Sequence, residues 1–111
     1  MHAFDVLGDP VRRRILELLA KNEQGSDALA DIIQKEFSIT QGAVSQHLKI
    51  LRDSNFANSR KDGVRRIYSI EEKAFQETLL WLNQFQQLWE PKLDAFAMEI
   101  ARGTKQRKPE Q

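Results

Sequence analysis

Apolar residues recur every three or four positions along the first half of the chain, which is the period of an amphipathic helix. Three such stripes follow one another: Val11, Ile15, Leu18 and Leu19, then Leu29, Ile32, Ile33 and Phe37, then Val44, Leu48 and Leu51. Asp9, Ser26 and Thr40 precede the three stripes, and each is suited to cap the helix that follows. Pro10 fits the first position of the first of these helices. The pattern therefore predicts three helices, and residues 2–7 have room for a brief helix before them.

The second and third of these helices are joined by a short connection, the sequence FSIT at residues 37–40. Two helices of about a dozen residues with a three- or four-residue turn between them are typical of a helix-turn-helix. The outer face of the third helix is unusual, because no carboxylate occurs between residues 37 and 52. Its polar side chains are small, amide-bearing or cationic. Such a face could contact a nucleic acid or simply face solvent, and the segments around it bear on the choice.

The segment that follows, residues 55–70, changes to the alternating pattern of β-strands. Asp62-Gly63 predicts a hairpin turn between two short strands, because this dipeptide favours the backbone angles of tight hairpin turns. Four cations crowd around the predicted tip: Arg60, Lys61, Arg65 and Arg66. A basic hairpin directly after a helix-turn-helix is a wing. The predicted fold class is therefore mainly α with a small β-hairpin wing, a winged helix-turn-helix.

From Glu71 onward the chain is predicted to be helical, with an apolar seam at a spacing close to a heptad repeat. The seam consists of Phe75, Leu79, Leu82, Phe85, Trp89, Leu93, Phe96 and Ile100. Pro91 lies in the middle and is expected to kink or break the helix, giving one bent helix or two consecutive ones. Residues 76–103 are interpreted as a terminal dimerisation helix of the same domain as residues 1–75, and residues 104–111 as a disordered basic tail.

The aromatic residues of this seam have two interpretations. They could form the core of a dimer, or they could line a pocket for an apolar small molecule. Aromatic residues at helical spacing usually form packing contacts, so the dimer is favoured. The expected dimer interface, which adds one residue of the N-terminal segment, is Phe4, Leu79, Leu82, Phe85, Trp89, Leu93 and Phe96.

Charge is unevenly distributed in this 111-residue chain, although its formal net charge is only +1. Residues 40–66 hold six basic residues against two acidic ones, and residues 102–111 hold four basic residues against Glu110. A localised basic patch on a nearly neutral protein suggests a surface that faces a polyanion. Together with the wing, this patch favours double-stranded DNA as the partner of the third helix over a merely solvated face.

A single helix fits into the major groove of DNA, where the base edges present hydrogen-bond donors and acceptors. Amides such as Gln41 and Gln46 can both donate and accept, Gly42 allows close approach of the backbone, and a helix N-terminus suits a phosphate. The basic hairpin is expected to reach an adjacent minor groove or its phosphates. The candidate DNA-binding residues are Thr40, Gln41, Gly42, Ser45, Gln46, His47, Lys49, Arg60, Lys61, Arg65 and Arg66.

Two further features have competing interpretations. His47 is expected to pack against the core or to contact a phosphate rather than to bind a metal, because no partner ligands accompany it. The three arginines at positions 12–14 could contact the DNA backbone. They could equally form ion pairs within the chain, with acids such as Asp9 and Glu17.

Three segments together resemble the ArsR family of dimeric bacterial winged-helix repressors. They are VLGDPVRRRILELL (6–19), AVSQHLKILRDSNF (43–56) and RKDGVRRIYSI (60–70). The segment LWEPKLDAFAMEIARG (88–103) also resembles an actinobacterial-type subgroup of that family. The resemblance implies a homodimeric repressor that binds a near-palindromic operator.

Many members of that family release DNA when they bind a metal or when their thiols are oxidised, and this chain departs from that pattern. It has no cysteine and only two histidines, His2 and His47, of which the second lies within the predicted recognition helix. Thiol sensing by its own residues is therefore excluded, and a soft-metal sensor is not expected. We expect no metal site and no cofactor, and the sequence identifies no small-molecule effector.

Catalysis and a membrane location receive no support from the sequence. It contains no Ser-His-Asp spacing, paired carboxylates or glycine-rich phosphate loop, so no catalytic residues and no enzyme are expected. No apolar run approaches the roughly 18 residues that a membrane helix needs, and the N-terminus lacks the pattern of a signal peptide, so a cytoplasmic protein is expected.

The favoured function is a sequence-specific, homodimeric transcriptional repressor. Two alternatives remain open. One is the same scaffold gated by an apolar small molecule bound between the terminal helices. The other is a winged-helix module for protein interaction that does not bind DNA.

Overall fold

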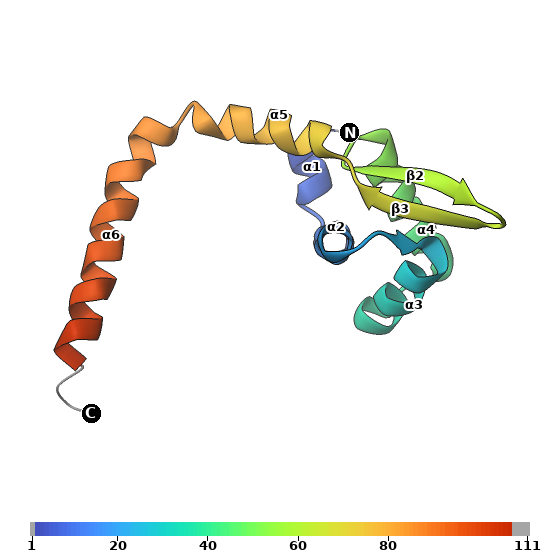
Figure 1. Ribbon diagram of the computed structural model, residues 1–111, viewed down its shortest axis with the longest axis horizontal. Helices are drawn as coiled ribbons and strands as arrows, with labels where there is room; N and C mark the ends of the chain where they lie inside the picture. The colour runs from blue at the N-terminus through green and yellow to red at the C-terminus, as the bar shows by residue number, and fades with distance from the viewer. Residues whose placement is uncertain (1, 108–111) are drawn as a thin grey trace. The chain divides into compact units, whose positions relative to one another are not determined.

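The computed structural model describes the backbone of residues 2–107 and the side chains of residues 2–89 and 95–101. The chain divides into two compact units, one ending at Thr78 and the other beginning at Leu79. The elements in chain order are α1 (Ala3–Leu7), α2 (Pro10–Lys21), β1 (Gln24–Gly25), α3 (Ser26–Phe37), α4 (Gln41–Asp53), β2 (Ala57–Asp62), β3 (Arg65–Ile70), α5 (Glu72–Asn83) and α6 (Gln86–Arg107) (Figure 1). This mainly helical architecture with a small antiparallel sheet confirms the predicted winged helix-turn-helix class.

Side-chain caps begin two of the three predicted helices. The Asp9 carboxylate accepts hydrogen bonds from the backbone N–H groups of Val11 (2.8 Å) and Arg12 (3.3 Å) at the start of α2. The Thr40 hydroxyl accepts from the backbone N–H of Ala43 (3.1 Å) at the start of α4. Both predicted caps are confirmed, and each supplies an acceptor to N–H groups that have no partner within their helix.

The predicted cap at Ser26 is wrong by one residue. Gly25 is the N-cap of α3, without a side-chain hydrogen bond, and Ser26 is already the first helical residue. The reason is that Gly25 also belongs to β1, where it pairs with Ile67 of β3. The chain is therefore extended up to Gly25 and becomes helical immediately after it.

The core of the first unit lies where α2, α3 and α4 pack together. Its largest fully buried side chains are Phe56, Ile15, Leu29, Ile33, Leu51, Val6 and Val44. All three apolar stripes contribute to it, and burying each side chain of this size contributes about 1.5–3 kcal/mol to folding. The ring of Phe75 packs edge-on against Phe56, with 4.9 Å between the centroids, and this contact attaches the start of α5 to the core.

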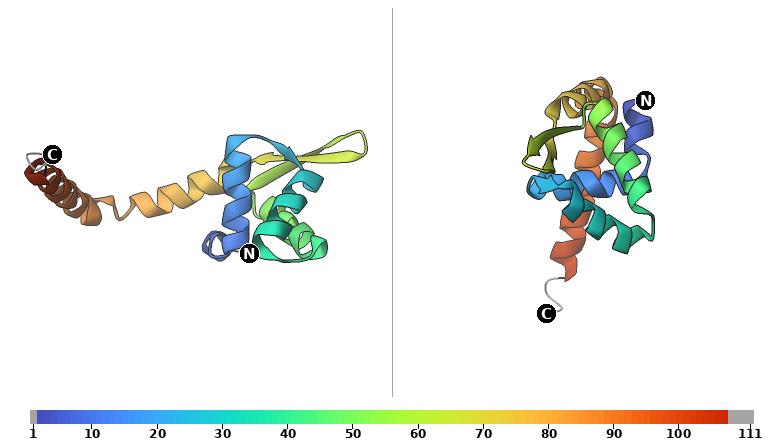
Figure 2. Two further views of the ribbon diagram at one scale, coloured as in Figure 1. Left: turned by 90° about the horizontal axis from the view of Figure 1, so that it is seen from below. Right: turned by 90° about the vertical axis from the view of Figure 1, so that its right-hand side faces the viewer.

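The sheet has three antiparallel strands in the order β1-β3-β2, one more than the sequence predicted. The additional strand, β1, pairs Gln24 with Tyr68 and Gly25 with Ile67. It joins the sheet to the connection between α2 and α3. The hairpin of β2 and β3 extends beyond the helices of this unit (Figure 2).

The hairpin turn lies one residue later than predicted. Asp62 pairs with Arg65 as the last pair of the ladder, so the two turn residues are Gly63 and Val64 rather than Asp62 and Gly63. Gly63 has a φ of 67°, a left-handed conformation that glycine adopts without steric cost. Glycine at the first central position is typical of a tight hairpin turn whose twist matches the strands.

The C-terminal segment forms two consecutive helices, as expected, but the interruption is not at Pro91. The chain leaves the helix at Gln84 and Phe85. The N–H of Gln84 donates to the carbonyl of Trp81 (3.3 Å) and the N–H of Phe85 to the carbonyl of Leu82 (3.0 Å), so these hydrogen bonds span three residues instead of four. Pro91 lies inside α6, so the prediction that it breaks the helix is wrong. Proline adopts a helical φ, and inside a helix it removes one backbone hydrogen bond, which here lies near the start of α6.

The boundary of the predicted tail also differs. Because α6 continues to Arg107, the helix covers the first four residues of the segment 104–111 that was expected to be disordered. Residues 108–111 lie outside the described residues.

Candidate nucleic-acid interface

The turn between α3 and α4 fixes the direction of α4. Ser38 has a left-handed backbone conformation (φ 55°), and its N–H donates to the carbonyl of Gln34 at 3.0 Å, which closes α3. Ile39 and the cap residue Thr40 complete a three-residue turn before α4 begins. The structure thus confirms the predicted helix-turn-helix, with a short connection that is bonded at both ends.

The two sides of α4 differ sharply in burial. Val44, Leu48 and Leu51 are at most 3% exposed and form its inner side. The opposite side carries the candidate groove face, which we define as the exposed residues Gln41, Gly42, Ser45, Gln46 and Lys49. It presents two amides, a hydroxyl, a cation and a glycine. The structure therefore brings these predicted DNA-binding residues together on one exposed surface, next to the exposed cap residue Thr40.

The end of α4 is bonded to the start of the wing. Asn55 has a φ of 65°, and its N–H donates to the carbonyl of Arg52 at 3.2 Å. The N–H of Phe56 donates to the carbonyl of Leu51 at 2.9 Å, and both of these side chains are fully buried. This pair of bonds with its apolar contact is the Schellman motif that ends many helices. It fixes the angle at which the chain passes from α4 into β2.

The four cations of the wing have different environments. Lys61 and Arg65 are exposed, whereas Arg66 is half-buried and donates to the hydroxyl of Ser59 at 3.0 Å. The guanidinium of Arg65 lies over Gly25, where a Cβ atom would approach its terminal nitrogen to 2.9 Å. The absence of a side chain at Gly25 therefore allows this position of Arg65.

Arg60 differs from the other wing cations because it is already paired. Its two terminal nitrogens donate to the two carboxylate oxygens of Glu23, both at 2.8 Å. These hydrogen bonds hold the pKa of Glu23 below its usual value. This bidentate pairing balances the charge of the Arg60 guanidinium in the protein without bound DNA. No local pattern in the sequence indicates this pair, because the two residues are 37 positions apart.

The surroundings of the arginines at positions 12–14 favour the interpretation that these residues form ion pairs within the chain. Arg14 bonds Glu36 at 2.8 Å and lies 3.4 Å from Glu17. Arg12 is buried and lies 3.8 Å from the Asp9 carboxylate. Both acids that the sequence suggested as partners, Asp9 and Glu17, are thus confirmed.

His47 lies at the edge of the groove face, next to the buried stripe of α4. It is half-buried on the flank of α4, and its Nδ1 is 3.2 Å from a terminal nitrogen of Arg12. The ring is therefore packed against the body of the protein, as one of the two interpretations of this residue expected. Within the described residues, no group of three His, Asp or Glu side chains could hold a metal ion.

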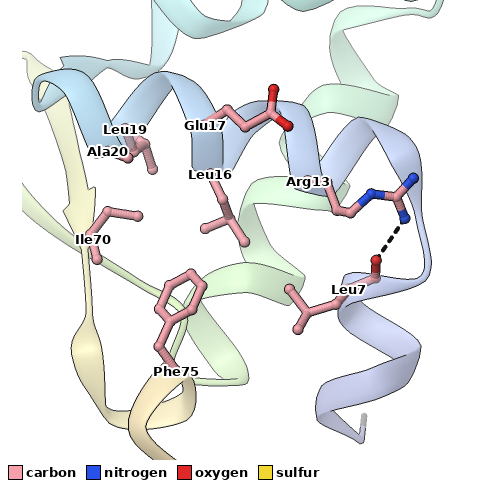
Figure 3. Close-up of a pocket in the computed structure, with 8 residues that line it drawn as sticks. All are labelled: Leu7, Arg13, Leu16, Glu17, Leu19, Ala20, Ile70 and Phe75. Carbon is pink, nitrogen blue, oxygen red and sulfur yellow. Dashed lines mark hydrogen bonds between the residues drawn. The ribbon is translucent and has the colours of Figure 1, made fainter. Parts of the chain in front are cut away.

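An apolar groove of about 560 Å³ lies between α1, α2, the end of β3 and the start of α5. Its apolar lining is Leu7, Leu16, Leu19, Ala20, Ile70 and Phe75, with Arg13 and Glu17 at its edge (Figure 3). Arg13 donates to the carbonyl of Leu7 at 2.7 Å. The sequence did not predict this groove, because its lining comes from four elements that only the fold brings together.

The second unit exposes much of its apolar surface. Among the predicted interface residues Leu79 is 57% exposed, Leu82 36% and Phe96 65%, and in the first unit Phe4 on α1 is 41% exposed. Phe85 and Trp89 are half-buried, and the side chain of Leu93 lies outside those described. Leu80, Trp81, Leu88 and Met98 are further exposed apolar residues.

Within α5, the four consecutive residues 79–82 are exposed and apolar, so this stretch is apolar on every side. A helix that is apolar all round is normally buried by neighbours. None of the described helices is both long enough and apolar enough to span a membrane.

Replacing Glu23 by glutamine is expected to strengthen binding to DNA of any sequence, because it releases the Arg60 guanidinium. The slope of the logarithm of affinity against the logarithm of salt concentration should steepen by up to about one unit, the contribution of one further phosphate contact. Titration of a labelled duplex at several salt concentrations measures this slope. Glu17→Gln is the matched control, because Arg14 keeps Glu36 as its partner in that variant. Equal slopes for the two variants would contradict the prediction.

Comparison with known proteins agrees with this geometry. The model of the family described as "Bacterial regulatory protein, arsR family" matches residues 9–59. The transcriptional repressor SdpR of Bacillus subtilis (strain 168) is 31% identical over 84 residues, which cover 76% of this chain and 89% of SdpR.

Solved structures give the same result. The crystal structure of an ArsR family transcriptional regulator superposes with a TM-score of 0.68 at 31% identity, covering 79% of this chain and 87% of that one. The homodimeric winged helix-turn-helix DNA-binding domain of Mb0332 from Mycobacterium bovis shares the fold, with a TM-score of 0.57, 24% identity and 78% of each chain covered. The chain therefore belongs to the ArsR family of bacterial regulatory proteins and is a winged helix-turn-helix transcriptional regulator.

Proposed function

We propose that this protein is a sequence-specific repressor that inserts α4 into the major groove of double-stranded DNA. The observation that carries the proposal is the groove face, an exposed surface without carboxylates on the opposite side of α4 from its buried stripe. The exposed wing cations Lys61 and Arg65 support it, because they extend the surface beyond α4. A duplex repels carboxylates and attracts cations, so this distribution suits DNA better than it suits a protein partner.

Each residue type on the groove face has a chemical role in this proposal. Gln41 and Gln46 pair with base edges, since an amide can donate and accept at once and so matches adenine N6 and N7. Lys49, Ser45 and the start of α4 at Thr40 contact phosphates. Gly42 lets the backbone approach the groove closely. The wing contacts the adjacent minor groove or its phosphates with Lys61, Arg65 and Arg66, whereas Arg60 does so only after it leaves Glu23.

We further propose that the repressor acts as a homodimer on a near-palindromic operator in the cytoplasm, where bacterial DNA lies. The exposed apolar residues of α5 and α6 support dimerisation, because an isolated helix with this surface would be poorly soluble. That Mb0332 is a homodimer and SdpR a repressor is consistent with this arrangement. A two-fold dimer places its two recognition helices about 34 Å apart, one turn of DNA. No catalytic role is proposed.

A second candidate function is supported by the apolar groove at α1 and α2. Its volume and lining suit a small apolar molecule, so the repressor could be gated by such an effector. A winged-helix module for protein interaction is the third alternative, and it is the least compatible with the groove face.

Selection of duplexes from a random pool by the purified protein tests the proposed function. We expect enrichment of two inverted half-sites whose centres lie about 10–10.5 base pairs apart. Binding to the selected site should weaken steeply as salt rises, because phosphate contacts release counterions. A pool that shows no enrichment would contradict DNA recognition and favour the interaction module.

A further inference from the structure

Arg12 is a buried cation that joins three elements. The residue is 8% exposed, although arginine is rarely buried without partners. Nε donates to the carbonyl of Val6 (3.0 Å) and one terminal nitrogen donates to the carbonyl of Asp5 (2.9 Å), both in α1. The other terminal nitrogen lies 3.2 Å from Nδ1 of His47 in α4. Arg12 itself belongs to α2, so one guanidinium connects α1, α2 and the recognition helix.

The carboxylate of Asp9 balances this buried charge at 3.8 Å. Burial raises the pKa of Asp9, but the backbone N–H groups of Arg12 and Val11, together with the electrostatic influence of His47 and of the Arg12 guanidinium, lower it by more. The net effect keeps the carboxylate ionised beside Arg12. The guanidinium is thus held in place by two carbonyl oxygens and one carboxylate, independently of His47.

The contact with Arg12 determines which nitrogen of His47 carries the proton. A guanidinium has five N–H donors and no acceptor, and it stays protonated in proteins. Nδ1 of His47 must therefore be the acceptor in the 3.2 Å contact. In a neutral imidazole with Nδ1 as the acceptor, the proton resides on Nε2. Nε2–H is then the single hydrogen-bond donor of the ring.

His47 follows Gln46 directly and lies between the groove face and the buried stripe of α4. A neutral N–H donor at the edge of a surface that enters the major groove lies beside the DNA backbone, where phosphate oxygens are the acceptors. We propose that Arg12 is a positioning residue for DNA binding: it holds His47 as the Nε2–H tautomer, and His47 donates that hydrogen bond to a phosphate beside the recognition groove. This inference rests on the proposed DNA-binding function.

The tautomer can be measured without DNA. In the full-length protein labelled with ¹⁵N, long-range proton–nitrogen correlation spectra distinguish a ring nitrogen that carries a proton from one that does not. We expect His47 to show an unprotonated Nδ1 and a protonated Nε2. His2 is the only other histidine, and a His2→Gln variant assigns the signals. In Arg12→Met, which keeps an unbranched apolar stem but removes the guanidinium donors, the preference for this tautomer should weaken. A proton on Nδ1 in the unmodified protein would overturn the proposal, whether or not Arg12→Met folds.

Two substitutions at His47 separate the two nitrogens. In His47→Asn the side-chain oxygen replaces Nδ1 as the acceptor for Arg12, but no donor remains at the place of Nε2. In His47→Gln the amide nitrogen replaces the Nε2–H donor, but the acceptor for Arg12 is lost. We expect His47→Asn to keep the unfolding temperature of the parent protein and to bind the selected duplex about tenfold more weakly. His47→Gln keeps the donor but loses its positioning by Arg12, so its affinity for the duplex should lie between those of the parent and of His47→Asn, and it should unfold at a lower temperature.

Equal DNA affinities of the two variants, or weaker binding by His47→Gln than by His47→Asn, would overturn the phosphate contact. A parent protein that enriches no duplex would instead contradict the proposed function. In that case the tautomer spectrum still tests the contact between Arg12 and His47, so the two failures are distinguishable.

Discussion

Replacing Gln46 by glutamate is expected to reduce affinity for the selected operator about a hundredfold while leaving the fold intact. Gln46 is exposed on the groove face, and glutamate has nearly the same shape. The substitution removes an amide donor, and one good bidentate base contact is worth about 1–3 kcal/mol. It also places a carboxylate among phosphates, which adds repulsion. Titration of the operator and of a scrambled duplex measures both effects.

Gln87→Glu is the matched control for this prediction. It makes the same change in net charge at an exposed position of α6, outside the winged unit. An acidic residue is favourable there because it lies in the first turn of the helix. Its operator affinity should fall by much less than that of Gln46→Glu. Equal losses in the two variants would show that net charge alone explains the effect and would remove Gln46 from the base contacts.

Replacing Phe96 by glutamate is expected to convert the protein to a monomer and to weaken operator binding by about 10²–10⁴-fold. Phe96 is 65% exposed on α6, so the substitution should not disturb the core of the winged unit. In a dimer, however, it places a charge in an apolar interface. Each protomer then binds only one half-site and loses the gain in effective concentration that a linked second site provides.

Sedimentation measures the oligomeric state, and titration with a full operator and with a single half-site measures binding. Gln87→Glu on the same helix again serves as the control and should remain a dimer. We expect Phe96→Glu to bind the single half-site as well as the parent protein does. A Phe96→Glu protein that stays dimeric would move the interface elsewhere, for example to Phe4 and the apolar groove beside α1.

The helices of the winged unit could be predicted because each one carries its own information. A stripe such as Val44, Leu48 and Leu51 specifies a buried side, and a cap such as Thr40 specifies a start. The groove face followed from the same two facts. These signals are local in the sequence, and tertiary packing agreed with them.

The features that the sequence did not predict depend on residues far apart in the chain. A two-residue strand such as Gln24–Gly25 has no periodicity, and it exists only because β3 pairs with it. The hairpin turn moved by one residue because the ladder includes Asp62 and Arg65. The pairing of Arg60 with Glu23 depends on the fold, and so does the contact between Arg12 and His47. Counting charges indicated a basic wing, but it could not show that one of its four cations, Arg60, is paired with an acid.

The left-handed residue Asn55 has a consequence for the operator itself. The bonds at Asn55 and Phe56 fix the junction between α4 and β2, so in the proposed complex each protomer holds its two DNA contacts at a set distance. One base pair advances along the duplex by about 3.4 Å. Each half-site must therefore have a fixed internal length, from the bases that α4 contacts to the step where the wing touches the backbone. In the proposed dimer, variation in operator spacing is then expected only at the centre of the palindrome, where the two protomers meet.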